Sequence, residues 1–103
     1  MEKLKNMNKV IELIEDKLSD HIWDPKTIVV YSSSGCGMCM ILKPKLYHVN
    51  EEYKVVIVDS SRHFKSNMFY PTELLWFPTV AYFENGTYIK DINKTEIEEG
   101  LWN

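Results

Sequence analysis

The stretch that decides the fold is residues 27–39, Thr-Ile-Val-Val-Tyr-Ser-Ser-Ser-Gly-Cys-Gly-Met-Cys. Its first five residues form a continuous run rich in β-branched side chains, which predicts a central strand buried on both faces. The segment Ser32–Gly35 then predicts a turn that delivers the chain to Cys36. A buried strand that ends at a cysteine pair is the feature around which the other elements are placed.

A helix is expected directly after this turn, over residues 37–52. Pro44 lies inside it and should kink it, because proline removes a backbone donor and clashes with the preceding turn. The next β-branched run, Lys54–Asp59, predicts a second buried strand, so strand, helix and strand together predict a βαβ unit. The residues expected on the inner face of the helix are Met40, Ile41, Leu46 and Val49.

The second half of the chain predicts a hairpin. Two β-rich runs, Thr79–Phe83 and Thr87–Asp91, flank the tripeptide Glu84–Gly86. Asn-Gly between such runs is a strong hairpin signal, because both turn positions require positive φ. Between the βαβ unit and the hairpin, residues 62–69 are a candidate for a short helix.

Helices are also expected near both ends. Apolar residues recur every three or four positions over residues 4–22, which predicts an amphipathic helix that covers a sheet face. Thr95–Glu98 matches a capping box and predicts a terminal helix that holds Ile97, Leu101 and Trp102. The whole order predicts an α/β fold with a mixed four-stranded sheet and helices on both faces.

Composition limits the classes of function. The chain has 103 residues, 45% hydrophobic and 26% charged, which is enough for one modest core. The formal net charge is -3 and no basic run is present, so nucleic acid is not an expected partner. Without an apolar run of ~20 residues or a secretory signal, we expect no membrane association and a cytoplasmic location.

The two cysteines, Cys36 and Cys39, carry the chemistry. If Cys36 starts the helix, Cys39 follows one turn later on the same face, and the two sulfurs can meet. The free N–H groups at the helix start favour an anion, which lowers the pKa of the Cys36 thiol. Cys36 would attack a substrate disulfide and Cys39 would resolve the mixed disulfide.

Two other interpretations of the pair were weighed. A zinc site needs two more ligands, and the three histidines show no paired spacing. Two structural cysteines on a helix face are also possible, but Cys36 lies in a glycine-flanked turn and outside the apolar stripe. We therefore expect neither a metal nor an organic cofactor. The histidines are His21, His48 and His63.

From about Thr27 to its C-terminus the chain resembles the thioredoxin-fold thiol oxidoreductases. Cys36–Cys39 is similar to the thioredoxin Cys-Gly-Pro-Cys, with Met38 in place of proline, and Pro44 falls where the thioredoxin active-site helix is kinked. Phe77-Pro78-Thr79 resembles the thioredoxin Ile-Pro-Thr, whose proline is cis and lies beside the active-site disulfide. The Phe and the Asn-Gly turn that thioredoxins place beyond this proline are matched by Phe83, Asn85 and Gly86.

The resemblance implies a single thioredoxin-like domain over residues 1–103 that reduces protein disulfides. It implies a monomer, with disulfide-containing proteins as substrates and a reductase or a thiol pool as electron donor. A cis peptide at Pro78 would expose the backbone of Phe77, where an extended substrate could pair as an added strand. The implied site is Cys36 and Cys39 as catalytic residues, with Gly35, Gly37, Met38, Phe77 and Pro78 contacting substrate.

The chain departs from this family pattern at two positions. Gly35 stands where thioredoxins have Trp, and the lead-in Tyr31–Cys36 is more similar to that of glutaredoxins. Val30 stands where thioredoxins keep a buried Asp that relays a proton to the second cysteine. Asp59 is a possible substitute, although capping the next helix is its expected role.

These departures leave two alternatives open. One is a glutaredoxin-like reductase that takes electrons from glutathione, although the residues before Pro78 and after Asp91 lack the usual glutathione-holding motifs. The other is a binding subunit of thioredoxin fold whose dithiol is incidental, which the missing Trp and Asp favour. Both cysteines and Pro78 argue against it. Tryptophans are expected in the core or at its edge, and the exception is Trp76, which lies two residues before Pro78 and could stack on a ligand. The other two tryptophans are Trp23 and Trp102.

Met38 predicts a less reducing dithiol than that of ordinary thioredoxin. Proline would fix φ and remove an N–H, whereas Met38 leaves an N–H free to stabilise the thiolate, and a stabilised reduced form is a stronger oxidant. Titration against glutathione buffers should give a potential above about -270 mV. A midpoint at or below about -270 mV would contradict the prediction.

Overall fold

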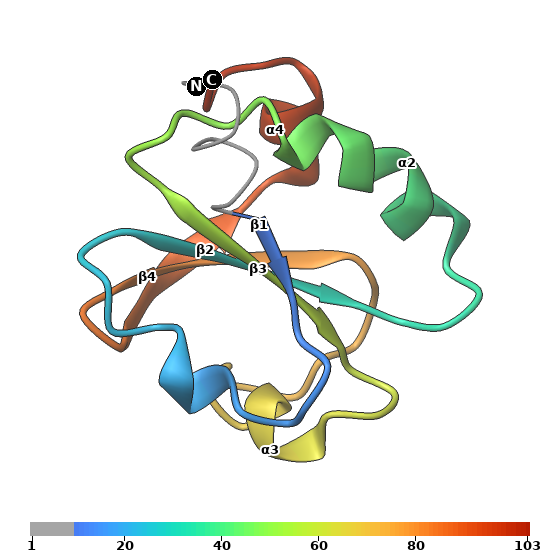
Figure 1. The fold of residues 1–103 in the computed structure, drawn as a ribbon. Helices are drawn as coiled ribbons and strands as arrows, with labels where there is room; N and C mark the ends of the chain where they lie inside the picture. The colour runs from blue at the N-terminus through green and yellow to red at the C-terminus, as the bar shows by residue number, and fades with distance from the viewer. Residues whose placement is uncertain (1–9) are drawn as a thin grey trace.

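The computed structural model describes residues 10–103, which form a five-stranded mixed sheet of order β1-β3-β2-β4-β5. The first three strands in this order are parallel, and β4 and β5 each run antiparallel to the preceding neighbour. The α/β fold with helices on both faces of a mixed sheet is thus confirmed (Figure 1). The strands are β1 (Val10–Glu12), β2 (Thr27–Ser32), β3 (Lys54–Asp59), β4 (Thr79–Glu84) and β5 (Thr87–Ile92).

The helices divide between the two faces of the sheet. Figure 1 shows α2 and α4 above the sheet, and α3 with the short 3-10 helix η1 below it. The sheet separates the core into two clusters, one on each side of the central strand β2. The helices are η1 (Leu18–Asp20), α2 (Gly37–Leu46), α3 (Phe64–Asn67) and α4 (Lys94–Glu98).

The sheet has five strands, and the prediction of four was wrong. The additional strand is β1, in the segment for which a helix over residues 4–22 was predicted; residues 4–9 lie outside the described residues. Val10 and Ile11 instead pair in parallel with β3. Pairing β-branched residues with an existing strand outweighs the local helical pattern. Ile14, on the predicted apolar stripe, is accordingly 89% exposed.

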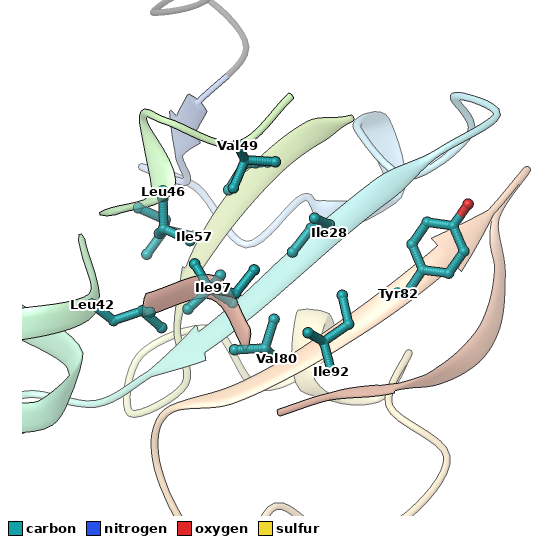
Figure 2. Close-up of a cluster of buried hydrophobic side chains, with 11 residues drawn as sticks. Ile28, Leu42, Leu46, Val49, Ile57, Val80, Tyr82, Ile92 and Ile97 are labelled. Carbon is teal, nitrogen blue, oxygen red and sulfur yellow. The ribbon is translucent and has the colours of Figure 1, made fainter. Parts of the chain in front are cut away.

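Successive side chains of β2 point alternately into the two clusters, as expected for a strand that is buried on both faces. Ile28 and Val30 lie in the cluster beneath α2 and α4, whereas Val29 and Tyr31 lie in the cluster above α3 and η1. Figure 2 shows the first cluster, with α2 and α4 contributing side chains against the sheet. The labelled residues from these helices are Leu42, Leu46 and Ile97.

Helix α2 is shorter than predicted and buries a different face. It ends at Leu46, so the predicted extension to residue 52 was wrong, although Val49 is buried beyond its end. Leu42 and Leu46, one turn apart, contact the core. Met40 and Ile41, expected on the inner face, are exposed because they lie to the side of this stripe.

The predicted hairpin is confirmed. Asn85 and Gly86 join β4 to β5 with φ of 51° and 84°. The ring of Trp23 covers the turn so closely that a Cβ on Gly86 would lie 2.2 Å from a ring carbon. Trp23 is therefore an exposed ring against the turn and not a core residue, contrary to expectation, whereas Trp102 packs on the first cluster.

Asp16 ties the segment after β1 to the start of α3. Its carboxylate accepts hydrogen bonds from the amides of Lys65 and Ser66, both at 2.8 Å, and from the Ser66 hydroxyl at 2.6 Å. These amides belong to the first turn of α3, where helix N–H groups have no partner within the helix. Asp59, the expected cap, instead accepts from the amide and hydroxyl of Ser61.

We predict that Asp16→Ala lowers the free energy of unfolding by about 1–3 kcal/mol at neutral pH, because three donors lose their acceptor. The pKa of Asp16 is lowered from 3.8: burial acts to raise it, but the hydrogen bonds from Ser66 and Lys65 outweigh burial. A carboxyl with a lowered pKa in the folded state stabilises the fold above its unfolded pKa and loses that effect as pH falls.

Urea unfolding of both forms between neutral pH and about pH 3 measures this difference. The difference in free energy of unfolding between the wild type and Asp16→Ala should be constant as pH falls to the ordinary carboxyl pKa, and it should shrink below that pH. Asp20→Ala, which removes an exposed carboxylate from η1, is the matched control and should have little effect. An equal loss in both variants would contradict a capping role for Asp16.

Candidate functional site

The site lies at one edge of the sheet, where β2 and β3 end and β4 begins. Tyr31 is paired with Thr79, and the amide of Ser60 donates to the carbonyl of Ser32 at 2.7 Å. The segments after β2, after β3 and before β4 are therefore neighbours at this edge. Any side chain placed on the loop after β2 follows a strand whose first five residues are all buried.

Cys36 caps the N-terminus of α2. Gly35 adopts a φ of 75°, which turns the chain, and the amide of Cys36 then donates to the carbonyl of Ser33 at 3.3 Å. The backbone of Cys36 is extended, and its sulfur accepts from the amide of Cys39 at 3.1 Å. The N–H that reaches the sulfur thus belongs to Cys39, whereas the sequence pointed to that of Met38.

Cys36 and Cys39 are joined by a disulfide, with Cα atoms 5.3 Å apart. The helix start holds the pair in the expected arrangement, one turn apart on the same face. The first turn of α2 contains no acidic residue. A thiolate formed on reduction would therefore lie at the positive end of the helix dipole, with a backbone N–H directed at it.

The surroundings of the disulfide are open on one side and apolar on the other. Gly35, Gly37 and Met38 are exposed, and a Cβ at either glycine would meet no other atom within 4 Å. Val30, in contrast, is 2% exposed and lies in the cluster that α2 covers. The position of the family's buried Asp is therefore filled by a packed core residue.

Phe77 and Pro78 lie at the same edge of the sheet. Their peptide bond is cis, as the resemblance implies. Both residues line a cleft of about 550 Å³ with residues of β5 and α4, and Phe77 also packs on the cluster of α3 and η1. Among residues 10–103, the amide and carbonyl of Phe77 have no hydrogen-bond partner.

A second hollow, which we name the α3 groove, lies on the other face of this edge. Its volume is about 510 Å³. One wall residue, Tyr70, donates its hydroxyl to Asp91 at 2.6 Å; burial, and then this bond, raise its pKa. The groove is lined by Ser33, Ser60, Ser61, Phe64, Asn67, Met68, Tyr70, Thr72, Glu73, Leu74 and Phe77.

Sequence reasoning missed the α3 groove. Residues 60–75 show no clear period, and α3 covers only four of the eight residues suggested for a helix over 62–69. The available signal was the density of large apolar residues in this aperiodic stretch, with Phe64, Met68 and Leu74 among them. Apolar residues outside any periodic element can line an interaction surface.

The described part of the chain offers neither a cluster of metal ligands nor a membrane-spanning helix. No group of three or more His, Cys, Asp or Glu side chains there could hold a metal ion. No helix within that part is long and apolar enough to cross a membrane. Of the three histidines, only His63 is buried, at the N-terminus of α3.

A disulfide at the start of a helix and a cis-proline, both at one edge of a mixed sheet covered on both faces, are features of the thioredoxin-fold class. The family model for thioredoxin matches residues 9–103, and the chain belongs to the thioredoxin family. No curated protein matches the chain by sequence.

Similar solved structures support the fold. Oxidised thioredoxin from Plasmodium falciparum is 15% identical with a TM-score of 0.73, covering 87% of this chain and 92% of that one. Thioredoxin O2 from Arabidopsis thaliana is 14% identical with a TM-score of 0.70, covering 94% and 97%. The zinc-bound form of human ERp44 is 14% identical with a TM-score of 0.67, covering 87% of this chain but 29% of that one.

In the reduced protein, we predict that the pKa of the Cys36 thiol lies below its ordinary value and below that of Cys39. Cys36 is at the helix N-terminus and receives an N–H bond, whereas Cys39 lies one turn inside the helix. The pH dependence of iodoacetamide alkylation in Cys39→Ser and Cys36→Ser reports each thiol separately. Alkylation of the two thiols at the same midpoint would contradict the prediction.

Proposed function

We propose that the chain is a thiol–disulfide oxidoreductase that reduces disulfides of protein substrates in the cytoplasm. The observation that carries the proposal is the Cys36–Cys39 disulfide at the N-terminus of α2. A disulfide at this position, with glycines on either side of Cys36 exposed, is accessible to a second polypeptide. No metal or organic cofactor takes part in the proposed reaction.

The reaction transfers two electrons and two protons from the dithiol to the substrate. The Cys36 thiolate attacks one substrate sulfur, the substrate S–S bond breaks, and the released thiolate takes a proton. The Cys39 thiolate then attacks the Cys36 sulfur, the bond between Cys36 and the substrate breaks, and the second substrate sulfur leaves as a thiolate that takes a proton from water. The protein is left with the Cys36–Cys39 disulfide, which a separate reductase or a thiol pool must reduce.

Two features of the site assist the first step. The helix dipole and the Cys39 amide favour the thiolate form of Cys36, which is the attacking species. The unpaired amide and carbonyl of Phe77 can pair with an extended substrate segment, as an added strand pairs with a sheet edge. Phe77 and Pro78 would thus position the substrate disulfide.

The second step lacks the buried carboxylate of the usual relay. Val30 cannot take the proton of Cys39, and the Asp59 carboxylate is engaged by Ser61. We propose that the substrate thiolate leaving in the first step, or water, accepts the Cys39 proton. The resolving step is then expected to be more sensitive to pH than the attack by Cys36.

An insulin-reduction assay tests the proposed activity. With dithiothreitol as donor, the wild type should accelerate the reduction of insulin disulfides, and Cys36→Ser should reduce the rate to that of dithiothreitol alone. Cys39→Ser should accumulate mixed disulfides with substrate, because no resolving thiol remains. The absence of turnover in the wild type, with a partner still bound by Cys36→Ser, would support the binding-subunit alternative.

The electron donor is tested in the same assay. A glutathione-dependent enzyme would turn over with glutathione and glutathione reductase, whereas the proposed protein should need a reductase that acts on its own disulfide. Thioredoxins have Trp at the position of Gly35, whereas Gly35 has no side chain that could shield the approach to Cys36. Turnover with glutathione comparable to that with dithiothreitol would support the glutaredoxin-like alternative.

A further inference from the structure

We infer that the α3 groove binds the side chain of the substrate residue next to the attacked cysteine, and that this residue is large and apolar. The inference rests on the proposed function, because it concerns how a polypeptide lies beside the Cys36–Cys39 disulfide. It adds a specificity-determining surface on the face of the sheet opposite α2.

The first step concerns which face each residue of the edge occupies. Phe77 packs on the cluster of α3 and η1 and lines the α3 groove. Its neighbour Pro78 lines, together with Phe77 itself, the cleft formed with α4, which lies with α2 on the other face. Figure 1 shows α3 and α2 on opposite sides of the sheet. The edge is therefore a boundary between the face with the disulfide and the face with the groove.

The second step concerns a substrate strand at this edge. A strand that pairs with the free amide and carbonyl of Phe77 places the residue opposite Phe77 on the side of the Phe77 ring. Successive side chains of a strand point to opposite faces. A substrate cysteine directed toward Cys36 on the α2 face therefore has its neighbour directed into the α3 groove.

The third step concerns what the groove accepts. Phe64 and Met68 are 69% and 81% exposed, although both are large and apolar. With Leu74 and Phe77 they form apolar walls, and Glu73 is the charged residue among the lining residues. Contiguous exposed apolar surface is a mark of interaction sites. An apolar side chain would be buried here, whereas an acidic one would meet Glu73.

The fourth step concerns how firmly the groove is held. The hydroxyl of Ser34 lies 3.2 Å from that of Ser61, which joins the cysteine loop to the loop after β3. Asn67 donates to the carbonyl of Ser60 at 2.9 Å, and the Tyr70 hydroxyl is bound by Asp91. The groove and the cysteine loop are thus connected parts of one surface, and a substrate can contact both.

Synthetic peptides test the inference. Each carries one cysteine, activated as a mixed disulfide with nitrothiobenzoate, in an alanine background. The residue before or after the cysteine is Leu, Phe, Tyr, Ala, Lys or Asp. Attack by reduced protein releases the coloured nitrothiobenzoate thiolate. We expect release to be about tenfold faster with Leu, Phe or Tyr than with Ala at the position opposite Phe77, and slowest with Asp.

Variants assign this preference to the groove. Phe64→Ser/Met68→Ser should reduce the preference to about twofold or less. Met40→Ser is the matched control, because Met40 is 74% exposed on α2, outside the groove, and it should keep the full preference. Equal loss in both variants would overturn the assignment.

The outcomes separate the inference from the proposed function. Release at equal rates for all peptides would overturn the inference while leaving the dithiol chemistry intact. Failure to release the thiolate from any peptide, with wild type and Cys36→Ser alike, would overturn the proposed function itself. A preference that follows the residue on one side of the cysteine only would also give the direction of the substrate strand.

Discussion

The structure depends on the burial of β2 between two clusters of apolar side chains. Ile28 and Val30 face one cluster, and Val29 and Tyr31 face the other. A shift of one residue would exchange these two faces, so β2 pairs with its neighbours in one register and ends at one position. Its end fixes where the chain leaves the sheet, and Gly35 then turns the chain so that Cys36 caps α2. The position of a reactive sulfur thus follows from the packing of a strand that carries no reactive group.

The burial of β2 also accounts for one departure from the family pattern, at Val30, which changes the chemistry of the site but not its geometry. Val30 stands where the family places a carboxylate, yet it packs in the same cluster that supports α2. An apolar residue here adds to the core and avoids the cost of burying a charge. Cys36 keeps its place at the helix terminus, and in the proposed reaction the proton of Cys39 would pass to groups outside the core.

The parts of the fold that could be predicted are those in which local pattern and tertiary packing agree. Burial on both faces restricts β2 and β3 to apolar, β-branched residues, so these strands can be recognised from the sequence. Positive φ restricts the hairpin turn in the same way, to residues such as Asn85 and Gly86. Residues 10–22 could not be predicted, since their spacing suits a helix while pairing with β3 requires a strand. Asp16 acts across 49 positions of sequence, so no local pattern reveals it.

The candidate site divides in the same way. Cys36, Cys39 and Pro78 belong to short motifs, and their placement could be inferred before the structure was known. Phe64 and Met68 could not, because their proximity to Phe77 arises only when α3 packs below the sheet while α2 packs above it. A strand edge between two covered faces offers two surfaces to a bound polypeptide, since side-chain direction alternates along it. The cysteine pair lies at the start of α2 and faces one of these surfaces, so in the proposed complex the residue next to the substrate cysteine would be recognised on the other.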